Sequence, residues 1–277
     1  MDFQVSARKW RPQKFSELIG QEHIVRTLRN AIELNKISHA YLFSGTRGVG
    51  KTTTARILAK AINCAKGPIP EPCDECNFCQ EITLGNSIDV REIDGASNNS
   101  VAEARELIEN IRYAASASRY KVYIIDEVHM LSDQAFNALL KTLEEPPSQT
   151  LIILIASNPY QLLPTIVSRC QGIRFYPLPA EAIRKIIAHH LESETGEAQP
   201  EELELRSRRA MGQVARAMQE DLLETSQHRE ELIDLIGIAS FKRMDRVFLW
   251  TKTWAKQGDR IQLILDELMN LLRDAAI

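Results

Sequence analysis

The chain has 277 residues, of which 44% are hydrophobic and 26% charged, so it can bury a core in one large domain or in two to three small ones. Its formal net charge of -3 excludes a polycation, and any contact with nucleic acid must therefore come from local patches or from an assembly. No apolar run approaches the ~18 residues of a membrane span, and the N-terminus lacks the apolar core of a signal peptide. We expect a cytoplasmic protein with no membrane partner.

The first 178 residues alternate between predicted strands and predicted helices. Short apolar runs with few charges are typical of strands covered on both faces, and apolar residues spaced three and four apart predict amphipathic helices. The expected strands are residues 39–45, 88–94, 121–127 and 150–157, and the expected helices are residues 22–35, 51–64, 101–114 and 132–145. This alternation predicts an α/β fold with a doubly wound parallel sheet.

From about residue 180 the sequence predicts helices alone. Residues 180–194 and 201–223 have helical apolar spacing, and two or three further helices are expected after them. The polar stretch 192–202 indicates a boundary between segments. We therefore expect an α/β domain over residues 1–178 and helical segments after it.

The glycine-rich stretch after the first expected strand matches a phosphate-binding loop. It has the pattern G-x-x-x-x-G-K-T from Gly45 to Thr52, with a strand before it and a helix after it. Its glycines let backbone N–H groups surround phosphate oxygens, while Lys51 would meet the β- and γ-phosphates and Thr52 would ligate Mg²⁺. A chance glycine turn is the alternative, which this strand–loop–helix context disfavours. The predicted cofactors are ATP and magnesium, bound by Gly45, Gly48, Gly50, Lys51, Thr52 and Thr53.

Acidic and polar residues end the next two buried strands. Asp126 would hold magnesium at the end of the strand 121–127, and Glu127 would polarise the attacking water. The alternative is that the two acids cap the helix that follows. Ser157 and Asn158 end the strand 150–157, where a polar side chain would face the γ-phosphate; an ordinary turn before Pro159 is the alternative. Together with the loop, the acids predict ATP binding and hydrolysis.

Four of the five cysteines lie within sixteen residues of one another. Cys64 is followed by Cys73, Cys76 and Cys79, the last three in a C-x-x-C-x-x-C pattern, which predicts a closed structural zinc site. Redox activity or an iron–sulfur cluster is the alternative for such soft ligands. Cys170 stands apart and is expected to be a small buried apolar residue.

A basic run lies on one of the later predicted helices. Arg206, Arg208 and Arg209 fall within four residues and are expected to form a solvated helix face. Contact with DNA phosphate or with an adjacent subunit is the alternative.

Taken together, these stretches make the chain resemble the AAA+ clamp-loader subunits of bacterial DNA polymerase III. The resemblance covers residues 5–178 and rests on five stretches: ARKWRPQKFSELIGQEH, HAYLFSGTRGVGKTT, PCDECNFC, KVYIIDEVHMLSDQAFNALLKTLEEPP and LLPTIVSRCQ. Its N-terminal part is similar to gamma/tau motor subunits and its later part to delta-prime subunits. It implies an AAA+ domain with a zinc insertion at 64–79, a helical lid at 179–220 and a partial collar at 221–277. The implied partners are other clamp-loader subunits in a ring, the sliding clamp and primer–template DNA.

The resemblance also assigns roles to single residues. Arg8 and Pro12 match positions that lie against the adenine, and Arg169 matches the arginine finger given to a neighbouring subunit's ATP site. The motor subunits carry a lid arginine three residues after a glycine, whereas here Arg216 comes four residues after Gly212. A shift of one residue turns a helical side chain by about 100°. Arg216 is therefore a weak match to the γ-phosphate sensor.

Two functions follow as hypotheses. In the first, the chain is an ATPase subunit that uses ATP binding and hydrolysis to load the sliding clamp onto primed DNA. In the second, it is a delta-prime-type scaffold that binds ATP with little hydrolysis and contributes Arg169 to a neighbour. The displaced Arg216 favours the scaffold, and the intact loop with Asp126 and Glu127 favours the motor.

Overall fold

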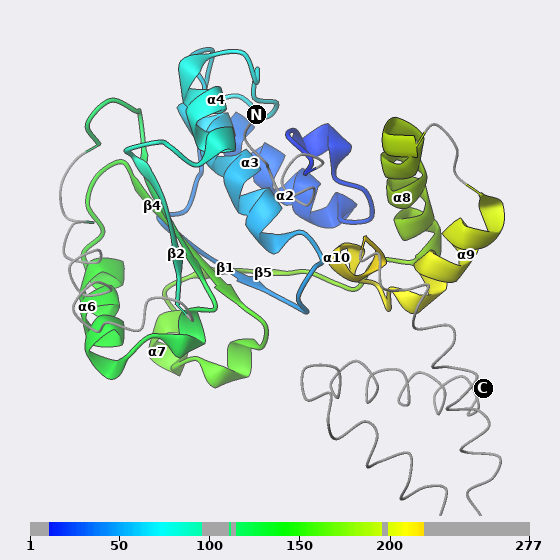
Figure 1. The fold of residues 1–277 in the computed structure, drawn as a ribbon. Coiled ribbons are helices and arrows are strands. Elements are labelled where there is room, and N and C mark those ends of the chain that lie inside the picture. The colour runs from blue at the N-terminus through cyan, green and yellow to red at the C-terminus, as the bar shows by residue number, and fades with distance from the viewer. Residues whose placement is uncertain (1–10, 96–110, 112–114, 196–198, 219–277) are drawn as a thin grey trace, which may run out of the picture. The chain divides into compact units, whose positions relative to one another are not determined.

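The computed structural model describes residues 11–95, 111, 115–195 and 199–218 of the chain (Figure 1). Arg8, all of the expected helix at 101–114 except residue 111, and the whole of the expected collar at 221–277 lie outside these residues. Of the described helices, none has the length and apolar character that crossing a membrane requires.

A parallel sheet of five strands forms the centre of the described part. Its strand order is β2-β3-β4-β1-β5, and every neighbouring pair is parallel. Four strands confirm the sequence prediction, and β5 is an additional strand, formed by residues that the sequence did not mark as one. The strands are β1 (Ala40–Ser44), β2 (Val90–Asp94), β3 (Lys121–Asp126), β4 (Thr150–Ala156) and β5 (Gln171–Arg174).

Helices cover both faces of this sheet, as a doubly wound fold requires (Figure 1). One face packs against α2 (Glu22–Glu33), α3 (Lys51–Asn63) and α4 (Asn77–Leu84). The other packs against α6 (Asp133–Glu144) and α7 (Pro164–Val167). Three 3₁₀ turns complete this part: η1 (Phe15–Glu17), η3 (Val128–Met130) and η4 (Pro159–Gln161).

The alternation of side chains along each central strand supplies the two cores. On β1, Phe43 points to the α3 face and Leu42 to the α6 face, and on β4 Ile153 and Leu154 divide in the same way. All seven residues of β4 are buried, because β3 and β1 flank this strand and helices cover both of its faces. A continuous apolar run in the sequence is the signature of such a strand.

The helical segment after the sheet consists of α8 (Ala180–Thr195), α9 (Pro200–Arg209) and α10 (Val214–Ala217). The expectation of a solvated arginine face is wrong for two of the three residues. Arg206 and Arg209 are only 8% and 9% exposed, and Arg206 pairs with Glu202 one turn earlier, while Arg208 is largely exposed. Helical spacing explains the difference, since Arg206 and Arg209 are three residues apart and share one face.

The segment that enters β3 is held by one carboxylate. Asp89, 2% exposed, accepts hydrogen bonds from the backbone N–H groups of Ser116 (2.7 Å), Ala117 (2.8 Å) and Ser118 (2.7 Å). Burial by itself would raise the pKa of Asp89, but these bonds outweigh it and leave the pKa below its usual value.

We expect Asp89→Asn to lower the free energy of unfolding by about 2 kcal/mol at neutral pH, because an amide loses charge-assisted bonds to three donors. The carboxylate's contribution is present above the pKa of Asp89 in the unfolded chain and disappears as the pH falls through its lower pKa in the folded chain. Urea unfolding at pH 7 and at pH 3 measures both, with Glu33→Gln on the exposed end of α2 as the control. A loss at pH 7 no larger than that of Glu33→Gln would contradict the assignment.

Candidate functional site

The glycine loop connects the end of β1 to the start of α3. Gly50 has φ 100° and directly precedes Lys51, the first residue of the helix. Gly45 has φ 143°, and a Cβ atom there would lie 2.5 Å from the carbonyl oxygen of Phe175. Both positions therefore require glycine, and the turn leaves the N-terminal end of α3 facing the loop. A helix N-terminus with free N–H groups attracts anions.

Lys51 lies inside this loop and is 7% exposed. Its amino group donates to the carbonyl oxygens of Gly45 (2.6 Å) and Thr46 (2.7 Å). Burial lowers the pKa of Lys51, while the negative charges of Asp126 and Glu127 act in the opposite direction. The loop thus places a lysine between its own backbone and two carboxylates.

The carboxylate that ends β3 meets the first turn of α3. Thr52 Oγ1 donates a hydrogen bond to Asp126 Oδ2 at 2.8 Å, although the two residues are 74 positions apart. A hydroxyl and a carboxylate are the oxygen ligands that Mg²⁺ takes beside a nucleotide. The structure therefore brings together Lys51, Thr52 and Asp126.

Glu127 lies beside these residues in an uncommon backbone conformation. Its φ is 45°, and its N–H donates to Asp126 Oδ1 at 2.9 Å. Ser157 Oγ lies 3.3 Å from Glu127 Oε2, and His129 Nδ1 lies 3.5 Å from the same oxygen. Sequence reasoning missed His129, whose signal is its place two residues after Glu127, where the short η3 turn folds it back onto that side chain.

The structure contradicts the capping alternative for these acids and distinguishes the two polar residues after β4. The helix α6 is capped by Ser132, whose side chain accepts from the N–H of Ala135, so Asp126 and Glu127 are not its caps. Asn158 accepts from the N–H of Tyr160 and caps η4, as an ordinary turn residue does. Ser157 instead faces Glu127.

The helical segment after the sheet touches the glycine loop directly. The N–H of Val214, the first residue of α10, donates to the carbonyl oxygen of Gly48 at 2.9 Å. A Cβ atom at Gly48 would lie 3.1 Å from the Cβ of Ala215. This contact was not predicted, since no sequence pattern links residues so far apart. Arg216 follows on the same short helix and contacts the sulfur of Met211 at 3.8 Å.

Arg169 lies in a different place from this cluster. It follows α7, which packs on the sheet face opposite to α3, and its guanidinium contacts Glu144 Oε1 and the carbonyl oxygen of Thr165, both at 2.8 Å. Its side chain is 35% exposed. Cys170 beside it is only partly buried, in contrast to the expectation, although it packs against the α6 core and burial raises the pKa of its thiol to about 11.

Pro12 lies near the loop helix. Pro12 and Thr53 line one small pocket on the outside of α3, together with Ile57 and Thr83. Thr53 is in the first turn of the helix, and Arg56 and Lys60 of its later turns line the same pocket. The structure thus places Pro12 close to the first turn of α3.

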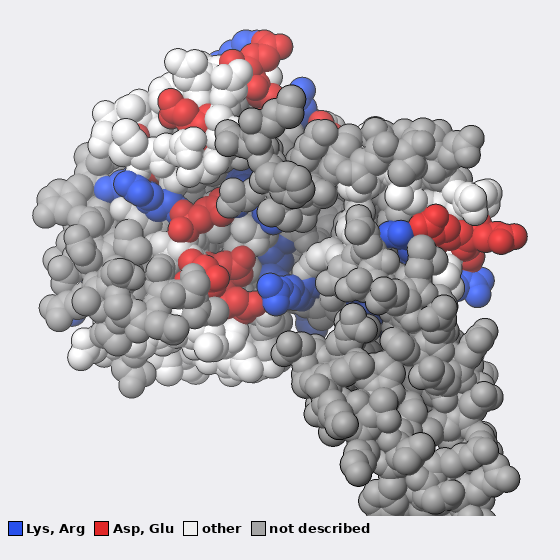
Figure 2. Space-filling view, in the orientation of Figure 1, with Lys and Arg blue, Asp and Glu red and all other residues white. Residues whose placement is uncertain are grey.

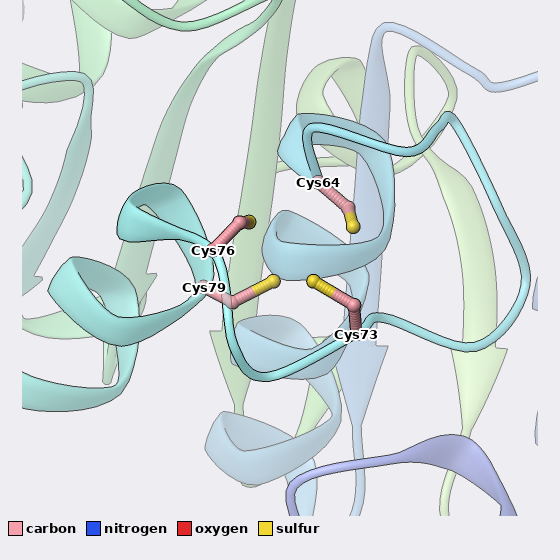
Figure 3. Close-up of side chains that lie close together, drawn as sticks. All are labelled: Cys64, Cys73, Cys76 and Cys79. Carbon is pink, nitrogen blue, oxygen red and sulfur yellow. The ribbon is translucent and has the colours of Figure 1, made fainter.

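The four clustered cysteines converge at the far end of α3 (Figure 3). Cys64 ends that helix, Cys73 lies in the following loop, Cys76 precedes α4 and Cys79 lies within it. Their sulfur atoms all lie within 4.8 Å of one another, and none forms a disulfide. Sulfur atoms around a tetrahedral zinc ion are about 3.8 Å apart, from Zn–S distances near ~2.3 Å. The arrangement therefore fits a metal ion held by four thiolates.

The surroundings shift the pKa values of two of these thiols in opposite directions. Burial raises the pKa of the Cys79 thiol, whereas backbone N–H groups of Glu75 and Cys76 lower the pKa of Cys73 to about 6. Cys64 and Cys79 are fully buried. Cys73 and Cys76 are partly buried, so the cluster lies between the protein interior and the surface.

Figure 2 shows the charged side chains of the described residues on one face of the molecule. On the face seen in Figure 2, acidic and basic side chains of the described residues lie next to one another, without a continuous basic area. Arg56 of α3 and Glu92 of β2 form a salt bridge on the surface. This part of the surface accordingly agrees with the small net charge.

Comparisons with known proteins place the chain in a family. Residues 20–179 match the family described as "DNA polymerase III, delta subunit". The chain is 49% identical over 218 residues to DNA polymerase III subunit tau of Escherichia coli, covering 79% of this chain and 34% of that protein. It is 53% identical over 201 residues to subunit tau of Bacillus subtilis, covering 71% and 36%. The chain thus spans about a third of the length of these relatives.

A shorter relative and one solved structure complete the comparison. DNA polymerase III subunit gamma of Buchnera aphidicola subsp. Schizaphis graminum is 43% identical over 272 residues, covering 96% of this chain and 74% of that protein. The Thermotoga maritima RuvB branch migration motor has a TM-score of 0.58 at 18% identity, covering 82% and 67%, which shows a shared fold. The gamma and tau relatives favour gamma/tau over the delta-prime alternative. The chain belongs to the family of DNA polymerase III gamma and tau subunits.

Proposed function

We propose that the chain is an ATP-binding and ATP-hydrolysing subunit of a clamp loader of DNA polymerase III. The single observation that supports this most is the 2.8 Å contact between Thr52 Oγ1 and Asp126 Oδ2 beside the buried Lys51. A chance glycine turn would have no reason to meet the carboxylate of a strand two positions away in the sheet. The family supports the same reading, since its relatives are named as polymerase III subunits.

The roles within the site follow from chemistry and position. The backbone of Gly45, Gly48 and Gly50 and the first turn of α3 with Thr53 would surround the phosphates, and Lys51 would neutralise their charge. Thr52 and Asp126 would hold magnesium, which when bound neutralises charge on the phosphate oxygens. Glu127 would accept the proton of the attacking water, and Ser157 would orient Glu127 through their present contact.

The helical segment α8–α10 would act as the lid of the nucleotide site. The hydrogen bond from the N–H of Val214 to the carbonyl oxygen of Gly48 supports this. If bound phosphates moved the glycine loop, this hydrogen bond would transmit the movement to α10. Small shifts at a γ-phosphate are commonly amplified into movements of whole domains. In this proposal residues 1–178 bind nucleotide, residues 179–220 form the lid, and residues 221–277 belong to a collar that joins subunits.

Arg169 would serve a neighbouring subunit rather than its own site. Its position after α7, partly exposed and on the opposite face of the sheet from α3, supports this role. A guanidinium stabilises the charge that spreads over a transferring phosphoryl group. The partners would be other clamp-loader subunits in a ring, the sliding clamp, and primer–template DNA. ATP binding would hold the ring in the form that opens the clamp, and hydrolysis on DNA would release it.

The four cysteines would hold one structural zinc ion. Four soft thiolates leave no open position for catalysis, and the convergence of their sulfurs supports a closed site. The cofactors of the chain would then be ATP, magnesium and zinc.

Lys51→Ala is expected to abolish ATP binding at millimolar ATP, because the loop loses the lysine that would face the phosphates. Glu127→Gln is expected to keep ATP binding but to lower turnover by roughly 10²–10⁴-fold, since an amide is no general base. Calorimetry gives the affinities, and steady-state ATPase rates in the reconstituted complex give the turnover. The control is Lys66→Ala on the exposed surface of the cysteine loop. Normal turnover by Glu127→Gln would exclude Glu127 as the base.

Arg169→Ala is expected to leave ATP binding by this chain unchanged and to lower the turnover of the assembled complex by up to about 10³-fold. The measurement is the ATPase rate of the complex with and without primed DNA. Glu144→Gln is the control, because it removes the ion-pair partner of Arg169 but leaves the guanidinium. Equal loss in both variants would indicate that only the local ion pair matters.

Purified chain is expected to contain about one equivalent of zinc, and Cys73→Ser or Cys79→Ser should lose the ion and lower the melting temperature. Cys170→Ser, the fifth cysteine, is the matched control and should keep both. Atomic absorption and thermal unfolding measure the two quantities. A chain with full stability and less than about half an equivalent of metal would contradict the zinc site.

A further inference from the structure

A buried lysine at the far end of the loop helix has no part in the proposed nucleotide site. Lys60 lies in the last turn of α3 and is 1% exposed. Its amino group forms a salt bridge with Asp74 and donates to Gln13 Oε1 at 2.8 Å. A buried ammonium is costly unless it is paired, so both partners are held in place by it.

The first partner belongs to the cysteine insertion. Asp74 directly follows Cys73, precedes Cys76 by two residues and has φ 59°, a left-handed conformation in the turn between these two cysteines. Its carboxylate also lies 3.9 Å from Lys14. The position of the Asp74 carboxylate is therefore linked to the arrangement of the cysteines beside it.

The second partner belongs to the segment before α2, residues 11–18. Three polar groups of Gln13 are engaged: its side-chain oxygen accepts from Lys60, its Nε2 donates to the carbonyl of Arg11 (2.7 Å), and its N–H donates to Glu17 Oε2 (2.7 Å). The hydroxyl of Thr83 on α4 lies 3.1 Å from the same side-chain oxygen. Gln13 thus connects the turn η1 to the end of α3.

A second acid of the insertion reaches the same segment independently. Glu71 accepts from the hydroxyl of Ser16 at 3.3 Å and pairs with Arg29 of α2 at 3.3 Å. Segment 11–18 is therefore attached to the insertion through Asp74, both by way of Lys60 and by the ion pair with Lys14, and through Glu71. Pro12 of this segment shares its pocket with Thr53 in the first turn of α3.

We propose that Lys60, Asp74 and Gln13 are positioning residues through which the four-cysteine insertion holds segment 11–18 against the first turn of the loop helix. In this arrangement metal binding by the cysteines strengthens nucleotide binding at the other end of α3. The metal has no direct contact with nucleotide, and its effect passes through the salt bridge and the glutamine. This inference rests on the proposed nucleotide and metal sites. It adds an effect of the metal on ATP affinity to its effect on the stability of the fold.

Two measurements on the full chain test it. Hydrogen exchange of a peptide covering residues 13–18 reports whether the segment is held, and calorimetry with ATP reports affinity. Gln13→Ala is expected to raise exchange of the segment about tenfold and to weaken ATP binding about fivefold, while keeping the metal, because one charge-assisted bond is lost. Chelation of the metal from the unsubstituted chain should raise the exchange in the same peptide.

Matched variants separate positioning from general stability. Gln13→Glu keeps an acceptor for Lys60 but loses the Nε2 donor to the Arg11 carbonyl, so both readouts should fall between those of Gln13→Ala and those of the unsubstituted chain. Lys66→Met, which replaces an exposed lysine of the same insertion, should change neither. Leu139→Ala, in the core on the opposite face of the sheet, should lower the melting temperature without changing either readout. Lys60→Met should behave as Gln13→Ala does, and if it fails to fold, Gln13→Ala and chelation still give the answer.

The inference is overturned if metal removal or Gln13→Ala leaves the exchange of residues 13–18 unchanged, or if Gln13→Ala raises exchange with no loss of ATP affinity. Failure of the proposed function looks different. In that case the unsubstituted, metal-loaded chain would bind no ATP, while the exchange measurement would still report whether the insertion holds the segment.

Discussion

The contact between the Thr52 hydroxyl and the Asp126 carboxylate depends on the register of three parallel strands. Leu42 of β1 and Ile125 of β3 both pair in register with Leu154 of β4. The three strands therefore end at the same edge of the sheet, where the loop after β1 meets Asp126, the last residue of β3. A slip of one residue in β3 would turn Asp126 to the other face of the sheet. The buried apolar residues of the central strands prevent that slip, and the polar site is therefore positioned by its apolar surroundings.

The helix α3 connects the candidate nucleotide site to the cysteine cluster. It has 13 residues and is about 20 Å long, so its two ends serve two separate clusters. Lys51 and Thr52 lie at the first turn, and Lys60 and Cys64 lie at the last. Because ten of its residues are buried, the helix is held as one rigid body between the sheet and the insertion.

Prediction from the sequence worked where the signal was local. The alternation of apolar runs predicted four strands, the spacing of glycines and lysine predicted the loop, and the spacing of Cys73, Cys76 and Cys79 indicated a cluster. It failed where a partner from elsewhere in the chain decided the outcome. The strand β5 is short and has one buried residue, so only pairing with β1 makes it a strand. Arg206 and Arg209 were expected in solvent because charged residues usually are.

By itself, the sequence determined the fold class, the phosphate-binding pattern, the acids that end a buried strand and the four thiols, since each depends on residue types at fixed local spacing. Only the tertiary structure decided which of these residues meet. It brought Ser157 and His129 to Glu127, placed Val214 on the glycine loop, and joined Lys60 to Asp74 and Gln13. Such contacts join residues on different elements of the fold, and their geometry follows from how strands and helices pack rather than from any pattern within a segment.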